Sequence, residues 1–342
     1  MKFASSRLIF QRSIASLGVL NNLILILLII FKSPKQLGHY KYLMGYITIF
    51  EILYSILDFV SVPEIFSKDS IFVIVIYKKL AFLPEVLLKY ANMAFCSLFG
   101  MSMAIFAIHF VYRYLIVTGS RFLQKKHFQK VMSLILFTVF VGFIWSIATN
   151  IFLNNNVYSD AKLSNDYLNS RNVTLEEIDY VGAHFHQIDS SGVEFINWKS
   201  MGAVLIMTIV IFLSFSTVFY CGLEIYNRIR IMSSIQSSGT KNLQSQLFWA
   251  LVFQTMIPVF LMHIPASIGF ITSMCNQTTE VLGETTEWTI FMYPALDPLP
   301  NFFIIKSFRQ AILEFIGCMR KSVVPPNATN SKKATGNTIP LH

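Results

Sequence analysis

The chain has 342 residues, of which 54% are hydrophobic and only 13% charged, and its mean hydropathy is +0.57. A water-soluble domain usually carries about a quarter charged residues, so this composition argues against a soluble fold. The formal net charge is +9, but no basic run interleaved with aromatic residues and no nucleic-acid reader motif accompanies it. We therefore expect no nucleic-acid partner.

The apolar residues gather into blocks of about 20, and 20 helical residues at about 1.5 Å each match a hydrocarbon core of about 30 Å. In chain order, we predict spans at residues 12–31, 42–62, 90–112, 130–152, 200–222, 247–273 and 286–305. The first block could be a signal peptide, but it is longer than a usual signal segment and no small-x-small cleavage site follows. We therefore expect an all-α membrane protein, a seven-transmembrane helix bundle.

Lysine and arginine are unevenly divided between the two sides of the predicted membrane, and short loops rich in them stay in the cytoplasm. Seventeen of the 27 lie on one side: Lys32, Lys35, Lys41, Arg113, Arg121, Lys125, Lys126, Lys130, Arg228, Arg230, Lys241, Lys306, Arg309, Arg320, Lys321, Lys332 and Lys333. We predict that this side is cytoplasmic, with the N terminus extracellular and the C terminus cytoplasmic. Lys2, Arg7 and Arg12 favour the opposite orientation of the first helix, and the other loops outweigh them.

These assignments divide the chain into an extracellular N terminus at residues 1–11, a membrane domain at 12–305, and an amphipathic segment with a disordered cytoplasmic tail at 306–342. The polar, acidic loop from about 153 to 199 is the longest, and we expect it to cover the outer mouth of the bundle. Asn172 and Asn276 begin Asn-x-Thr sequons on the predicted outer side, where glycosylation occurs. Asn327 begins a third sequon in the predicted cytoplasmic tail, where it should stay unmodified.

Ionisable residues inside membrane helices are costly and mark functional sites. Glu51 and Asp297 lie about ten residues into their spans, which at about 1.5 Å per residue is near mid-bilayer. Asn21 and Asn22 come within about two turns of that depth. These side chains either form one polar cluster between the first, second and seventh helices or find separate partners and waters. Asp58, two turns beyond Glu51 on the same face, either meets a ligand or reaches toward the outer surface.

Three prolines stand within seven residues of the seventh span, at Pro294, Pro298 and Pro300. Proline removes a backbone donor and interrupts a helix. Asp297 and Asn301, one turn apart, can bind the freed backbone groups or water, which predicts a bendable polar hinge. The alternative is that the prolines merely end the span.

The sixth span contains Pro258 and Pro265, two turns apart, which permits a kinked helix whose inner end can move. The third span ends with His109-Phe-Val-Tyr112-Arg113-Tyr114, just before a basic loop. A lone arginine at an inner helix end is usually an anchor whose charge reaches the membrane surface.

The end of the third span, the sixth-span run from Gln246 to Pro258, and Tyr293-Pro-Ala-Leu-Asp-Pro-Leu-Pro300 with Ile304-Ile-Lys-Ser-Phe-Arg309 resemble the nematode Str-type serpentine chemoreceptors. The resemblance covers nearly the whole chain. It implies a seven-helix G-protein-coupled receptor in the sensory cilium membrane of chemosensory neurons. Its partners would be a small odorant or soluble cue, a heterotrimeric G protein and membrane lipid.

By this resemblance, Tyr112-Arg113 stands in the place of the Asp-Arg-Tyr signature of rhodopsin-like receptors, and Asp297-Pro298 in that of Asn-Pro-x-x-Tyr. We therefore expect His109, Tyr112 and Arg113 to serve G-protein coupling. Neither His109 nor Tyr112 is an acid, so the usual ionic lock is absent. The long outer loop contains no cysteine, so the common tether from that loop to the third helix cannot form.

The expected mechanism is a population shift in which a ligand from outside favours outward movement of the sixth helix's inner end. Judged by depth alone, the ligand pocket lies among the outer halves of helices three, five, six and seven. The candidate residues are Asn92, Met93, Trp198, His263 and Tyr293. A mostly apolar cavity there would suit a small volatile molecule.

Two other classes of protein compete with this interpretation. An enzyme lacks support, because no phosphate-loop or zinc-protease motif is present, and His184, His186 and Asp189 are better explained as a solvated loop than as a metal site. We expect no catalytic residue, metal or cofactor. A transporter or a seven-helix ligand-gated channel is the stronger rival, although such a channel would have its N terminus inside, against the charge distribution.

Overall fold

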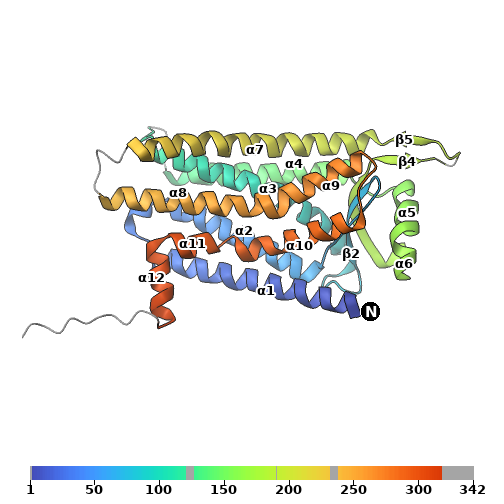
Figure 1. The fold of residues 1–342 in the computed structure, drawn as a ribbon, viewed down its shortest axis with the longest axis horizontal. Coiled ribbons are helices and arrows are strands. Elements are labelled where there is room, and N and C mark those ends of the chain that lie inside the picture. The colour runs from blue at the N-terminus through green and yellow to red at the C-terminus, as the bar shows by residue number, and fades with distance from the viewer. Residues whose placement is uncertain (1, 121–126, 190, 232–237, 318–342) are drawn as a thin grey trace, which may run out of the picture.

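The computed structural model describes residues 2–120, 127–189, 191–231 and 238–317. The long helices lie side by side along one axis, with the N terminus and the strands at one end of the bundle and α12 at the other (Figure 1). We call the end with the N terminus and the strands the outer end, and the end with α12 the inner end.

Within the described residues, seven helical segments run between these ends. They are α1 (Lys2–Phe31), α2 (Tyr40–Ser61), α3 (Glu85–Val117), α4 (His127–Phe152), α7 (Trp198–Ile231), a sixth made of α8 (Ser238–Pro258), η6 (Val259–His263) and α9 (Ile264–Met274), and a seventh made of α10 (Glu280–Leu296) and α11 (Leu299–Ile304). The first six are long and apolar enough to cross a membrane. All seven correspond to the predicted spans, and most extend past them because a helix continues beyond its apolar block. Helix α1 begins at Lys2, so the residues predicted as a separate outer segment are helical.

The sixth and seventh helices are irregular at their prolines. In the sixth helix, the wide turn η6 lies between Pro258 and Pro265, and the helix changes direction between α8 and α9 (Figure 1). In the seventh, α10 ends at Leu296 and α11 begins at Leu299, because Pro298 and Pro300 cannot donate the backbone hydrogen bonds of a continuous helix.

At the inner end, α12 (Lys306–Phe315) runs across the bundle (Figure 1). Ile305 has extended backbone angles and turns the chain there. Phe308 is fully buried against the bundle, whereas Phe315 is 91% exposed, as expected for an amphipathic helix at a membrane surface. The predicted disordered tail and the Asn327 sequon fall within residues 318–342, outside the described residues. A short 3-10 turn, η1 (Lys35–Leu37), joins α1 to α2.

A cap of strands and short helices, which the spans alone did not predict, covers the outer end. The strands β1 (Glu64–Lys68), β2 (Ile71–Tyr77) and β3 (Ile178–His184) form an antiparallel sheet in the order β1-β2-β3, and β4 (His186–Ile188) pairs with β5 (Glu194–Ile196). The short helices are α5 (Val157–Leu163), η3 (Ser164–Leu168), α6 (Asn169–Arg171) and η4 (Leu175–Glu177). We call residues 64–77 and 157–196 together the outer cap. The segment expected to cover the outer mouth therefore supplies only part of it.

Strand β2 is apolar along its whole length because both faces of the sheet are buried. Successive side chains of a strand point to opposite faces. Phe72 and Ile74 face the helix bundle, whereas Val73 and Val75 pack against Leu163 of α5 on the far side. The cap is thus two layers thick, with the sheet below and α5 and η3 above.

Candidate functional site

An apolar cavity of about 60 Å³ lies directly beneath the sheet of the outer cap. Its walls come from all three strands of that sheet and from α3, α4, α7, α9 and α10. The lining residues are Ile65, Phe72, Ile74, Phe95, Cys96, Phe99, Trp145, Leu153, Val181, Gly182, Met207, Ala266, Phe270 and Ile290. We call this space the deep cavity. Apolar cavities in proteins bind small apolar molecules.

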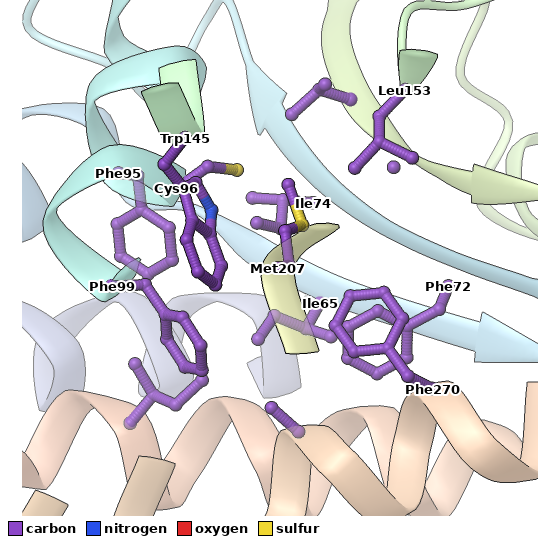
Figure 2. A pocket seen from close by; sticks show the side chains of 14 residues that line it. Ile65, Phe72, Ile74, Phe95, Cys96, Phe99, Trp145, Leu153, Met207 and Phe270 are labelled. Atoms are coloured by element: carbon purple, nitrogen blue, oxygen red, sulfur yellow. The ribbon is translucent and has the colours of Figure 1, made fainter. Parts of the chain in front are cut away.

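Aromatic rings form two sides of the deep cavity. Figure 2 shows Phe72 and Phe270 together on one side, Trp145 with Phe95 and Phe99 on the other, and Met207 between them. The ring centroids of Phe72 and Phe270 are 4.7 Å apart, a distance typical of packed aromatic pairs. Strand β2 is therefore joined to α9 by direct ring packing.

Gly182 of β3 allows the sheet to close over the deep cavity. A Cβ atom at this position would lie 2.3 Å from the carbonyl oxygen of Phe72 and 2.5 Å from Cα of Val73. Backbone atoms cannot yield at such distances, so any side chain here would force β2 and β3 apart. The glycine is required by close approach of the two strands.

The pocket residues guessed from depth do not line the deep cavity. Asn92 donates from Nδ2 to the carboxylate of Asp179 and so joins α3 to β3. Trp198 is 76% exposed, and Met93 is half-buried outside the cavity. Tyr293 is fully buried, with its ring centroid 5.8 Å from that of Tyr54. His263 lines a neighbouring cavity, where its Nε2 lies 3.0 Å from the hydroxyl of Ser102. Depth along a helix does not show which face of that helix borders a cavity.

Near mid-bundle, the two asparagines of α1 bind carbonyl groups of the seventh helix. Asn22 Nδ2 donates to the carbonyl of Pro294 at 3.0 Å, and Asn21 Nδ2 donates to that of Ala295 at 2.8 Å. Pro298 has no N–H, so it cannot occupy the carbonyl of Pro294 four residues earlier, and Asn22 supplies the missing donor. The carbonyl groups left free where the seventh helix is interrupted therefore receive their hydrogen bonds from α1.

Gln254 of α8 joins the sixth helix to the seventh where the seventh is interrupted. Its Nε2 donates to Oδ2 of Asp297, and its Oε1 accepts a hydrogen bond of 3.2 Å from Nδ2 of Asn301. Glu51 of α2 lies beside Asp297 and Asn22 and interacts with both. Neither carboxyl oxygen of Glu51 has a hydrogen-bond partner of ordinary geometry among the described residues.

The structure therefore brings together Asn21, Asn22, Glu51, Asp297, Pro298 and Asn301 as one cluster between α1, α2, α8 and the seventh helix. Asp58 lies apart from this cluster, buried to 1% exposure farther along α2. Its carboxyl oxygens have no hydrogen-bond partner among the described residues. A buried polar atom left unpaired costs about 1–3 kcal/mol, so both acids are positions where bound water would be stabilising.

At the inner end, Arg113 is only 2% exposed and holds the sixth helix. Its Nη2 donates to the carbonyl oxygen of Gln244 in α8 at 2.9 Å. Its guanidinium lies 5.3 Å from the ring centroid of Tyr40, which stacks on Tyr112. The hydroxyl of Tyr40 lies 3.3 Å from Nδ1 of His109. We call the contact of Arg113 with Gln244 and Tyr40 the inner latch. Arg113 is thus buried and contacts another helix. Its position at a helix end had suggested an anchor whose charge reaches the membrane surface.

A second contact fixes the inner end of α8 to α12, because the backbone N–H of Lys306 donates to Oε1 of Gln246 at 2.9 Å. No contact of Gln244, Gln246 or Tyr40 was predicted from the sequence, where Gln246 stands only as the first residue of the sixth-span motif. Residue type alone does not predict these contacts, since an amide or a tyrosine near a helix end is common.

Arg7 and Glu287 fasten the outer cap to the bundle, a role that was predicted for neither residue. Arg7 pairs with Glu64 of β1 at 2.7 Å and with Glu287 of α10 at 2.8 Å. Glu287 also accepts a hydrogen bond of 2.8 Å from the backbone N–H of Ile65. Glu287 is 2% exposed, and an acid in the predicted seventh span was the signal that could have identified it.

His184 and His186 lie in the outer cap, where His184 is buried and His186 is paired with an acid. Burial lowers the pKa of His184 to about 4, and the nearby Lys162 charge adds to this effect. Nδ1 of His186 lies 2.9 Å from the carboxylate of Glu194. Across the described ranges, no three His, Cys, Asp or Glu side chains are arranged to hold a metal ion. The two sequon residues, Asn172 and Asn276, are exposed at this outer end.

A seven-helix bundle with an apolar cavity at its outer end and a latched sixth helix at its inner end has the architecture of a transmembrane receptor. The fold is similar to that of squid rhodopsin, with a TM-score of 0.62 and 12% sequence identity over 92% of this chain and 85% of the rhodopsin chain.

Residues 7–313 match the family described as "Serpentine type 7TM GPCR chemoreceptor Str", and the chain belongs to this family. It is 35% identical to the G-protein coupled receptor str-217 of Caenorhabditis elegans, over 90% of each chain. It is 27% identical to the serpentine receptor class r-10 of the same organism, over 87% of each chain. The resemblance found in the sequence motifs is confirmed, as is the seven-helix membrane fold.

Proposed function

We propose that this membrane receptor is chemosensory: it binds a small ligand in the deep cavity and activates a heterotrimeric G protein at its inner end. One observation carries this proposal, namely that a single helix reaches both sites. Ala266 and Phe270 of α9 line the deep cavity, and α8, the continuation of the same helix, is held by Arg113 through Gln244.

The proposed mechanism is a shift between two packings of the sixth helix. A ligand in the deep cavity presses on Phe270 and Ala266. The π-helical segment η6 lies between Pro258 and Pro265, and helices kink at prolines and at π-bulges. Movement at η6 is transmitted to α8, withdraws the Gln244 carbonyl from Arg113, and opens a surface for the G protein. The cluster around Asp297 and Gln254 would then couple the seventh helix to the same movement.

Membership of a chemoreceptor family supports the expectations about the sense that the receptor serves and its location in the cell. We propose that the receptor acts in olfaction and chemotaxis, in the plasma membrane of the sensory cilium of chemosensory neurons, with lipid around the bundle. Asn172 and Asn276 are the proposed glycosylation sites because both are exposed at the outer end. No catalytic residue or cofactor enters this mechanism.

The test is ligand-evoked signalling in cells that express the chain, with a broad odorant panel, in the presence and absence of functional G proteins. Arg113→Ala should abolish coupling, because the guanidinium released from Gln244 is the group proposed to contact the G protein. Leu223→Ala, on the exposed face of α7, should not. Surface expression of both variants is measured in parallel. A ligand-evoked ionic current that persists without G proteins would contradict the proposal and favour a ligand-gated channel.

A further inference from the structure

The deep cavity is closed toward water by the outer cap. The sheet that forms its roof is covered on its far face by α5 and η3, whose Leu163 and Tyr167 are fully buried. Ion pairs lie around the cap, including Lys162 with Asp69 at 2.6 Å and Arg171 with Glu64 at 3.3 Å. A solute moving down the bundle axis would have to separate both layers of the cap.

A second cavity, of about 330 Å³, opens on the side of the bundle between α7 and α9. Helix α7 packs mainly on α3 and α4, and α9 on α10 and the sheet, so the seam between them is loosely filled. Leu205 and Ile271 line this cavity and are 62% and 60% exposed. Apolar residues exposed on the side of a membrane bundle face lipid. We call this space the seam cavity.

Only side chains separate the seam cavity from the deep cavity. Phe99, Trp145, Met207, Ala266 and Phe270 line both. Met207 stands between the two aromatic sides of the deep cavity (Figure 2). Methionine is unbranched and flexible, so its side chain can change rotamer with little cost. Passage from the seam to the deep cavity therefore needs side-chain movement and no separation of strands.

We propose that the ligand reaches the deep cavity from the lipid, through the seam between α7 and α9 and past Met207. This inference rests on the proposed function and adds the route and the class of ligand. The ligand is a small, uncharged, lipophilic molecule that partitions into the outer half of the bilayer. A charged or strongly hydrated molecule would lose its hydration without a partner, since the deep cavity is lined by apolar side chains.

The volume of the deep cavity, about 60 Å³, agrees with a small ligand. A larger ligand must extend into the seam cavity or displace Met207. The polar members of the seam cavity are His263, Thr208 and Ser267, so a single polar group on such a ligand would have partners there.

The route can be measured with xenon as the probe, because one xenon atom suits an apolar cavity of this size. The full-length receptor is reconstituted in lipid nanodiscs, and the exchange rate of bound xenon is measured by NMR. Ser267→Trp narrows the seam from α9 and should slow exchange about tenfold, corresponding to a barrier increase of about 1.4 kcal/mol. Ile268→Trp, at the next residue of α9 and outside the lining of both cavities, should leave the rate unchanged.

A chemical shift of bound xenon that is the same in all variants would show that the deep cavity is intact. Equal exchange rates in Ser267→Trp and the unaltered receptor would overturn the proposed route. So would faster exchange in Arg7→Ala, which weakens the fastening of the cap. These results are independent of G-protein activation, so the route can fail while the proposed receptor function stands, and the converse also holds.

Discussion

Arg113 Nη2 donates a hydrogen bond of 2.9 Å to the carbonyl oxygen of Gln244, which joins the third helix to the sixth, and no acidic side chain among the described residues pairs with this arginine. The charge is compensated by this carbonyl dipole and by the ring of Tyr40, 5.3 Å away. A carbonyl group cannot be removed by mutating a side chain. Arg113 is also proposed to contact the G protein, so the inner latch is tested through Tyr40.

Replacing Tyr40 with leucine should raise basal G-protein activation. A buried cation–π contact contributes about 2 kcal/mol, and losing 1–2 kcal/mol changes an equilibrium by roughly 5–30-fold. The readout is ligand-independent nucleotide exchange, normalised to surface expression. Tyr40→Phe keeps the ring and should stay near the basal level. Equal basal activity in Tyr40→Leu and the unaltered receptor would show that the ring does not restrain the latch.

Asn22→Leu should destabilise the bundle, because it leaves the carbonyl of Pro294 without a donor. Hydrogen bonds between membrane helices contribute about 0.6–2 kcal/mol, so the thermal midpoint in nanodiscs should fall by a few degrees. Leu23→Ala, at an exposed neighbouring position, serves as the control. An unchanged midpoint in Asn22→Leu would mean that water or another group takes the place of the amide.

Gly182→Val should abolish the ligand response by displacing the roof of the deep cavity. The new side chain would meet the carbonyl of Phe72 and Cα of Val73, both backbone atoms that cannot turn aside. Gly202→Val in α7 is the matched control, since no atom lies within 4 Å of a Cβ there. Xenon binding and ligand-evoked signalling are measured on both variants. A normal response in Gly182→Val would contradict the placement of the roof.

Acid should loosen the outer cap through His184. Its pKa of about 4 in the folded cap is below the value near 6.5 expected when unfolded, so the unfolded state binds the proton first as the pH falls. The cap's stability is complete above about pH 6.5 and declines toward pH 4, by at most about 3 kcal/mol. Hydrogen exchange of strand β3 at pH 7 and pH 4.5 measures this loss. His184→Gln should remove most of the pH dependence of this exchange. An unchanged pH dependence in His184→Gln would mean that other groups cause it.

The sequence predicted the bundle well because apolar blocks of membrane length are a strong signal, and each of the seven has its helix. From depth, the sequence left open whether the polar residues form one cluster or find separate partners, and the structure places Asn22 and Asp297 in one cluster. They meet there because a polar side chain in a membrane helix must turn inward to find partners.

The outer cap and the deep cavity could not be predicted in the same way. The run from Ile71 to Tyr77 is too short to span a membrane, and its pairing with residues 178–184 is a long-range contact that no local pattern shows. The deep cavity depends on which face of α3 or α9 meets that sheet. For the same reason Trp198 and Tyr293 looked suitable by depth but lie elsewhere.

Ligand binding in the deep cavity is tested most directly by filling that cavity with a larger side chain on α9. Ala266 is 5% exposed and lines both cavities, so Ala266→Phe would occupy space that the ligand needs. Purified receptor and heterotrimeric G protein are combined in nanodiscs, and nucleotide exchange is measured with a panel of small, uncharged, apolar compounds. We expect at least one compound to accelerate exchange on the unaltered receptor and none to do so on Ala266→Phe. An undiminished response with unchanged potency in Ala266→Phe would contradict the claim that the deep cavity is where the ligand acts.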